Sequence, residues 1–267
     1  MVVPLSFLRV TGAFVAVNAA LLLPFRAIYG DKRIPAKGSK GAKREGSRVA
    51  DLLAYNTAAL LFAVVVAVLG AREWLGDGAA AIGSSPYLRL YGHSEIFDLM
   101  ADITGGYELY NTAAVIIFPE YCNAAFIGHH VTTFTLALLS KRPFLHYYGF
   151  FFFGFAMISN IPLAFIELTQ AAAWPKAHTA SRLLFALFFL ALRTSYWPYV
   201  SSGFWADSLG AIGITAAPTM DVPNPYALWF FLLANFGLTG LQLLWTQKIV
   251  KGVAIAAGLI KKPKRAD

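Results

Sequence analysis

The sequence is poor in charge. Only 13% of its 267 residues are Asp, Glu, Lys or Arg, whereas 58% are hydrophobic. A soluble domain usually carries about 25% charged residues, so a soluble fold would require several apolar helices to bury one another completely. We therefore expect an all-α polytopic membrane protein.

Cysteine is nearly absent too, since Cys122 is the single one. One cysteine excludes an intramolecular disulfide and a cysteine-based zinc site, and we expect Cys122 to be a small buried hydrophobe. The first apolar run has no basic segment before it and no clear small-residue cleavage site. We therefore expect a retained membrane span there and not a cleaved signal peptide.

Long apolar segments are what the sequence has instead. A bilayer core of about 30 Å needs about 20 apolar residues per helix. Seven segments qualify, at about residues 5–27, 49–69, 96–118, 122–139, 146–168, 181–200 and 226–249. We expect an N-terminal helix with a basic cytosolic loop at 1–48, a membrane domain at 49–252 and a basic tail at 253–267.

The net charge of +8 is concentrated in two basic segments, one from Arg26 to Arg48 and one from Lys248 to Arg265. Seven helices place both on one side and the segment before the last span, which has two aspartates and no Lys or Arg, on the other. This obeys the positive-inside rule, with Lys141 and Arg142 as exceptions. We expect the basic loop to be a flexible orientation signal; docking to anionic lipid headgroups is the alternative, and nucleic acid is not an expected partner.

His129 and His130 stand side by side in the fourth apolar segment. Neighbours on a helix point about 100° apart, so the two rings cannot easily share one metal ion, and we expect no metal. Two interpretations stay open. The rings could be structural and bond across helices, for roughly 1 kcal/mol each, or one could act as a general base, because an imidazole pKa near 7 suits proton transfer.

Other polar residues interrupt the apolar segments. Asp98 and Asp102 share one helix face and lie either near the membrane interface or inside the bundle, whereas Glu108 lies deeper and should have a buried partner. Arg193 either reaches the interface or pairs with Glu108 or Glu167. Ser159, Asn160 and Pro162 predict a kink, in which Ser159 or Asn160 satisfies freed backbone groups.

The order of several short motifs resembles the TLC domain, which ceramide synthases share with several lipid-homeostasis proteins. The similar stretches are "NTAALLFAV", "GYELYN", "GHHVTTF", "MISNIPL", "LFALFFLALRTSYWPY" and "LTGLQLLWTQKIVKG". The resemblance implies a six-helix bundle, with one helix ahead of it and the histidine pair near a central cavity. It also implies acyl transfer from acyl-CoA, with His129 or His130 removing a proton from an amine or hydroxyl.

The chain departs from the family pattern at three places. Asn111 stands where the family has an aspartate, Met157 stands where it has a glutamate, and the His-Asp-x-x-Asp signature of ceramide synthases has no counterpart. Glu108 is a candidate to replace one lost carboxylate. The chain therefore resembles the small TLC-domain lipid-homeostasis proteins more than the true ceramide synthases.

These observations lead to two hypotheses. The first is a protein that sets membrane lipid composition or modifies lipids, with acyl-CoA as substrate and no cofactor. The second is a non-catalytic accessory subunit of a larger membrane complex. We expect lipids, and other membrane subunits, as partners, and the endoplasmic reticulum as location, with the mitochondrial inner membrane or plasma membrane as alternatives. The candidate catalytic residues are His129 and His130, and the candidate lipid-binding residues are Tyr107, Glu108, Asn111, Ser159, Asn160 and Arg193.

Overall fold

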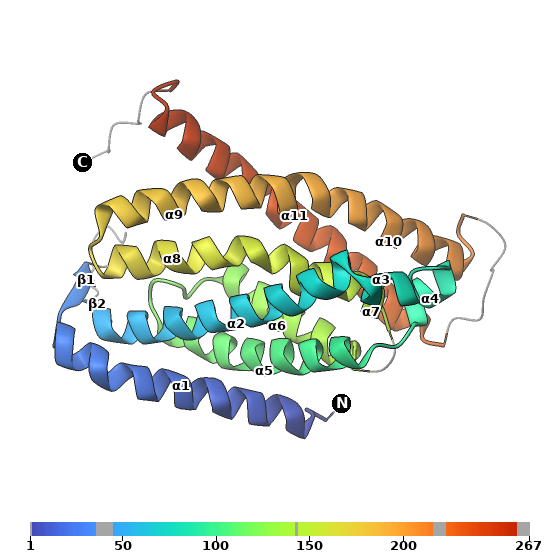
Figure 1. Ribbon diagram of the computed structural model, residues 1–267, viewed down its shortest axis with the longest axis horizontal. Helices are drawn as coiled ribbons and strands as arrows, with labels where there is room; N and C mark the ends of the chain where they lie inside the picture. The colour runs from blue at the N-terminus through green and yellow to red at the C-terminus, as the bar shows by residue number, and fades with distance from the viewer. Residues whose placement is uncertain (1, 36–44, 142–143, 216–222, 261–267) are drawn as a thin grey trace.

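Long helices that run roughly side by side dominate the computed structural model, which describes residues 2–35, 45–141, 144–215 and 223–260 (Figure 1). Five are single helices: α1 (Leu5–Tyr29), α2 (Val49–Leu75), α5 (Glu95–Ile117), α6 (Ala124–Leu139) and α11 (Pro225–Ala256). A first composite rod joins α7 (His146–Gly149), η1 (Phe150–Gly154), η2 (Phe155–Ser159) and α8 (Asn160–Ala171). A second composite rod joins α9 (Pro175–Phe188), η3 (Phe189–Tyr196) and α10 (Trp197–Ile212). The predicted all-α membrane fold is confirmed.

Length and composition qualify five of these elements as membrane spans, and α6 is a shorter apolar helix. Helix α5 is long enough but carries four carboxylates, which explains its lower hydropathy. All seven predicted segments correspond to helices. The segment at 181–200 was predicted far too short, because the rod from Pro175 to Ile212 runs on for 38 residues.

Short elements that the sequence analysis did not predict connect the long helices. Helices α3 (Asp77–Ile82) and α4 (Pro86–Tyr91) follow α2. Strands β1 (Arg33–Pro35) and β2 (Glu45–Arg48) pair antiparallel where a flexible loop was predicted; the middle of that loop lies outside the described residues. The Glu120 carboxylate accepts hydrogen bonds from the Ser47 amide at 2.8 Å and its hydroxyl at 2.6 Å, which ties β2 to the α5–α6 connection.

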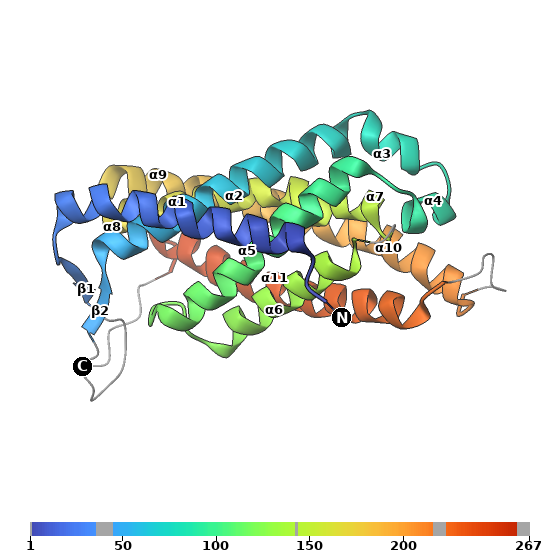
Figure 2. The same cartoon turned by 90° about the horizontal axis from the view of Figure 1, so that it is seen from below.

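The arrangement of the ends agrees with the topology predicted from charge. The β1–β2 pair and the C-terminal end of α11 lie at the same end of the bundle in both views (Figures 1 and 2). Lys141 lies toward the opposite end, where α1 begins and α5 starts. There its ammonium lies 3.0 Å from a carboxylate oxygen of Asp102, so this exception to the positive-inside rule carries a neutralised charge. Arg142 lies outside the described residues.

The prediction for Cys122 was wrong. Its side chain is exposed, because it lies in the connection between α5 and α6 and not inside a helix.

An ion pair fixes α4 to α10 at the same end as Lys141. Arg89 donates to both carboxylate oxygens of Asp207, at 2.6 and 2.7 Å, and to the carbonyl of Gly83 at 3.0 Å. The Tyr148 hydroxyl donates to Asp207 as well. The hydrogen bonds to Asp207 raise the pKa of Arg89 above its ordinary value. Two-pronged geometry of this kind is the strong form of a salt bridge.

Close backbone contacts between small residues bring the inner helices together. Gly70 on α2 faces Gly154, where η1 ends, and a Cβ atom on either glycine would overlap backbone atoms of the other. Helix α1 packs against Gly105 and Gly106 of α5 through Phe7 and Val10. Small residues at such crossings are the usual way in which membrane helices approach closely, because lipid provides no hydrophobic drive between them.

We predict that Gly70→Ala destabilises the protein by about 1–3 kcal/mol, because the added methyl group meets backbone that cannot move aside. Thermal unfolding in detergent measures the change. Gly237→Ala on α11 is the matched control, since nothing lies within 4 Å of its Cβ position and alanine favours a helix over glycine. Equal melting temperatures for Gly70→Ala and the wild type would show that the crossing tolerates a wider spacing.

Candidate functional site

A cavity of about 420 Å³ lies inside the bundle. Its lining comes from α2, α5, α6, the two rods and α11, and α1 contributes no described residue to it. The walls are mainly apolar and aromatic, in the manner of a lipid or small-molecule site, for which a volume of about 300–1,000 Å³ is usual. The main polar residues that line it are Tyr55, Asn56, Thr104, Tyr107, Glu108, Asn111, His129, His130, Asn160, Glu167, Arg193, Asn235, Gln242 and Lys248.

His130 is held on both sides of its ring. Its Nδ1 lies 2.7 Å from a carboxylate oxygen of Glu108, whose side chain is 5% exposed. The Asn111 amide nitrogen lies 3.1 Å from Nδ1 and 3.3 Å from Nε2, and the Tyr55 hydroxyl donates to the Asn111 oxygen. Since the carboxylate accepts from Nδ1–H, Nε2 is the atom left to accept from Asn111. The chain Tyr55–Asn111–His130–Glu108 is therefore closed, and Glu108 has the buried partner that the sequence predicted.

His129 is placed differently. Its ring lies 5.1 Å from that of His130 and 6.0 Å from the Trp245 ring on α11, edge to face in both cases. Its Nδ1 is buried and has no hydrogen-bond partner among the described residues. A buried polar atom without a partner costs free energy, and such atoms call for an explanation. Of the two histidines, His129 is the one whose Nδ1 has no hydrogen-bond partner among the described residues.

Arg193 lies on η3, and only 7% of it is exposed. Its Nε donates to the Ser159 hydroxyl at 2.8 Å, and its Nη2 donates to the Asn160 carbonyl at 3.0 Å and lies 3.4 Å from the Met157 sulfur. The guanidinium also lies 5.8 Å from the centre of the Trp197 ring. The groups that surround the Arg193 guanidinium are therefore neutral: a hydroxyl, an amide, a thioether and an indole ring.

The prediction that Arg193 pairs with Glu108 or Glu167 was wrong. No carboxylate of the described residues lies within ion-pair distance of Arg193. Glu108 instead faces His130, and Glu167 accepts a hydrogen bond from the Tyr121 hydroxyl at 3.2 Å. The alternative, in which Arg193 reaches the membrane interface, is also excluded by its burial among Ser159, Asn160 and Met157.

Both sides of the arginine cage come from irregular helical segments. Arg193 lies in a π-helical stretch, and Ser159 and Met157 lie in a 3₁₀ stretch that follows a second π-helical one. Breaks of this kind are frequent at functional sites. The kink predicted near Pro162 corresponds to a change from a 3₁₀ to an α-helical course at Asn160, and the Ser159 hydroxyl donates to the Ala156 carbonyl at 2.8 Å while it accepts from Arg193.

A family model for the TLC domain matches residues 54–251. The chain belongs to the TLC domain family. This links it to lipid metabolism or homeostasis as an integral membrane protein, as the motif resemblance implied. A comparison with curated proteins found no match.

The two positions at which the motif resemblance led us to expect a carboxylate, Asn111 and Met157, lie beside His130 and Arg193. Asn111 contacts His130 and Met157 contacts Arg193. His130 keeps a carboxylate because Glu108 lies one turn away on α5. Arg193 has no such substitute among the described residues, so its positive charge is available to a ligand.

The candidate residues fall into one region. His129, His130, Tyr107, Glu108, Asn111, Asn160 and Arg193 line the TLC cavity, and Ser159 supports Arg193 from behind. Tyr107 stacks on Phe62, with ring centres 3.7 Å apart. The sequence analysis missed Tyr55 and Gln242, which also line the cavity. The isolated glutamine in the apolar run "LTGLQLLW" was the signal that could have identified Gln242.

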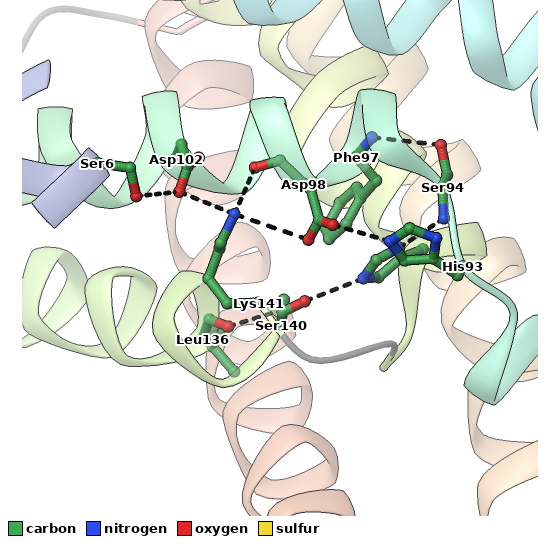
Figure 3. Close-up of polar contacts among 10 residues, drawn as sticks. Ser6, His93, Ser94, Phe97, Asp98, Asp102, Leu136, Ser140 and Lys141 are labelled. Carbon is green, nitrogen blue, oxygen red and sulfur yellow. Dashed lines mark hydrogen bonds and ion pairs between the residues drawn. The ribbon is translucent and has the colours of Figure 1, made fainter. Parts of the chain in front are cut away.

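Asp98 and Asp102 do not belong to this cavity. They bind Lys141 near the start of α5, and Ser6 of α1 donates to Asp102 at 2.7 Å (Figure 3). The His93 ring lies 2.8 Å from the other Asp98 oxygen. These contacts join α1, α5 and the end of α6, which supports a structural role near the membrane interface.

Met157→Glu provides a test of the unpaired Arg193. We predict that it stabilises the ligand-free TLC protein by on the order of 1–3 kcal/mol, because a carboxylate beside the guanidinium supplies the counter-charge that a buried arginine lacks. Thermal unfolding of delipidated protein measures this. Met157→Gln is the control, since it has nearly the same size and no charge. If Met157→Gln stabilises as much as Met157→Glu, Arg193 is not short of a counter-charge.

Proposed function

We propose that this TLC protein binds a lipid in its internal cavity and transfers an acyl group to or from it, with His129 as the base. The observation that carries the proposal is a pair of groups in the lining of one cavity: the His129 imidazole, whose Nδ1 has no hydrogen-bond partner among the described residues, and the Arg193 guanidinium, which has no described carboxylate within ion-pair distance. A buried cation and a free imidazole are costly at membrane depth and tend to mark function.

The chemistry follows from these groups. A lipid hydroxyl or amine attacks the carbonyl carbon of an acyl thioester, so that a carbon–oxygen or carbon–nitrogen bond forms and the carbon–sulfur bond breaks. His129 takes the proton of the nucleophile and returns it to the departing thiolate. Arg193 binds an anionic group of the lipid, a carboxylate or a phosphate. His130, held by Glu108, fixes the position of its neighbour on α6.

An exposed cation of the cavity lining also suits an acyl-CoA. Lys248 lines the cavity and is exposed in the C-terminal third of α11. Exposed positive charge raises the local concentration of an anionic substrate. We propose the endoplasmic reticulum membrane as its location, on the strength of the family resemblance alone.

A second candidate function is that of a non-catalytic lipid-binding subunit. The closed chain from Tyr55 to Glu108 favours it, because the Nε2 atom of His130 is engaged by Asn111 and no carboxylate of the described residues orients His129. In this alternative the cavity holds a lipid permanently, and the protein co-purifies with a partner at fixed stoichiometry.

Quantitative lipidomics of membranes that express each variant tests the proposal. We predict that the wild type shifts one lipid class, and that His129→Ala reduces the rate of that shift by about 10²–10⁴-fold, the usual contribution of a general base. His93→Ala, in the cluster at Asp98 and outside the cavity, is the control and should retain the shift.

All variants are compared at equal amounts of folded protein. Identical lipid profiles for the wild type and for the double variant His129→Ala/His130→Ala would rule out the enzyme. Co-purification with a second membrane protein at fixed stoichiometry would then show that the protein is a subunit of a larger complex.

A further inference from the structure

Helix α11 carries a polar stripe on the face that lines the cavity. Asn235, Thr239, Gln242 and Thr246 follow at spacings of four, three and four residues, which places them on one side of the helix. Gln242 is 2% exposed and Asn235 is 6% exposed. Both line the cavity, so this helix contributes two amides to the cavity wall.

The two threonines of the stripe are satisfied, whereas the amides are not. Thr239 accepts a hydrogen bond from the Trp197 indole at 3.0 Å, and Thr246 lies 2.8 Å from the Thr194 hydroxyl. The carboxamide oxygens of Gln242 and Asn235 are buried and have no partner among the described residues. An amide in that position forfeits its hydrogen bonds unless a bound molecule restores them.

The threonine contacts also fix where Gln242 lies. Thr194 is the residue after Arg193, and the Trp197 ring lies against the Arg193 guanidinium. Gln242 stands between Thr239 and Thr246 and therefore faces the turn of the neighbouring rod that carries Arg193. Trp245, three residues further on, contacts the His129 ring. Gln242 thus belongs at the level of Arg193 and His129.

We infer that Gln242 forms a second polar subsite, which binds a neutral hydrogen-bonding group of the ligand next to the anionic group held by Arg193. This inference rests on the proposed lipid-binding function and specifies its ligand. An amide offers one acceptor oxygen and an N–H₂ donor, and a hydroxyl, which both donates and accepts, matches it. The ligand is therefore a lipid that carries a hydroxyl beside its acidic group.

Binding of two probes that differ in one hydroxyl tests the subsite. The probes are hexadecanoic acid and 2-hydroxyhexadecanoic acid, titrated into delipidated protein in detergent. The wild type should prefer the hydroxy acid by about tenfold, the ratio that about 1.4 kcal/mol of hydrogen bonding gives. Gln242→Met, which has a similar length and no hydrogen-bonding amide, should remove the preference. Gln247→Met is the matched control, because Gln247 is exposed on the same helix, and should keep it.

Each result has a defined meaning. Equal affinities of the wild type for the two acids, or an undiminished preference in Gln242→Met, overturn the subsite while leaving lipid binding intact. Failure of the wild type to bind either acid overturns the anion site at Arg193 and the subsite together. If Gln242→Met does not fold, as judged by thermal unfolding, Gln242→Asn replaces it; the shorter side chain withdraws the amide by one methylene and should reduce the preference severalfold.

Discussion

A guanidinium at membrane depth is the group on which the inner structure depends. A charged side chain there needs neighbours that lipid cannot supply, and Arg193 obtains them from Ser159 and Asn160 of the adjacent rod. Those residues reach it because the rod changes from a π-helical to a 3₁₀ and then to an α-helical course. The close contact between Gly70 and Gly154 lets α2 pack directly against that break.

The histidine pair is a second polar centre, built on different helices and satisfied in a different way. His130 belongs to a closed set of hydrogen bonds with α5 and α2, whereas His129 faces α11 through Trp245. Adjacent residues on one helix point in different directions, so one ring anchors α6 to α5 while the other is left for the cavity. A structural role for His130 and a ligand-directed role for His129 are therefore compatible.

Hydropathy predicts the long helices of this chain well, because membrane depth requires apolar length and helical hydrogen bonding. The pairings were harder to predict. Glu108 and Arg193 each needed a partner, and opposite charge alone suggested that they would pair with each other. They do not pair, because α5 and η3 direct them to different sides of the cavity. The irregular stretches at 150–159 and 189–196 leave no clear mark in a sequence of Phe and Leu. Gln242 is a single glutamine in a mostly apolar run, and only the fold shows that it lines the cavity.

The two departures from the TLC pattern have unequal electrostatic consequences. Beside Asn111, the carboxyl group of Glu108 contacts His130, so the hydrogen-bond chain through this ring is complete. At Met157 no described residue compensates, and the thioether gives Arg193 only a weak acceptor. The net result is a cavity whose lining holds an arginine without a described carboxylate partner and a histidine with an unpartnered Nδ1. A cation of this kind favours a ligand that brings its own negative charge.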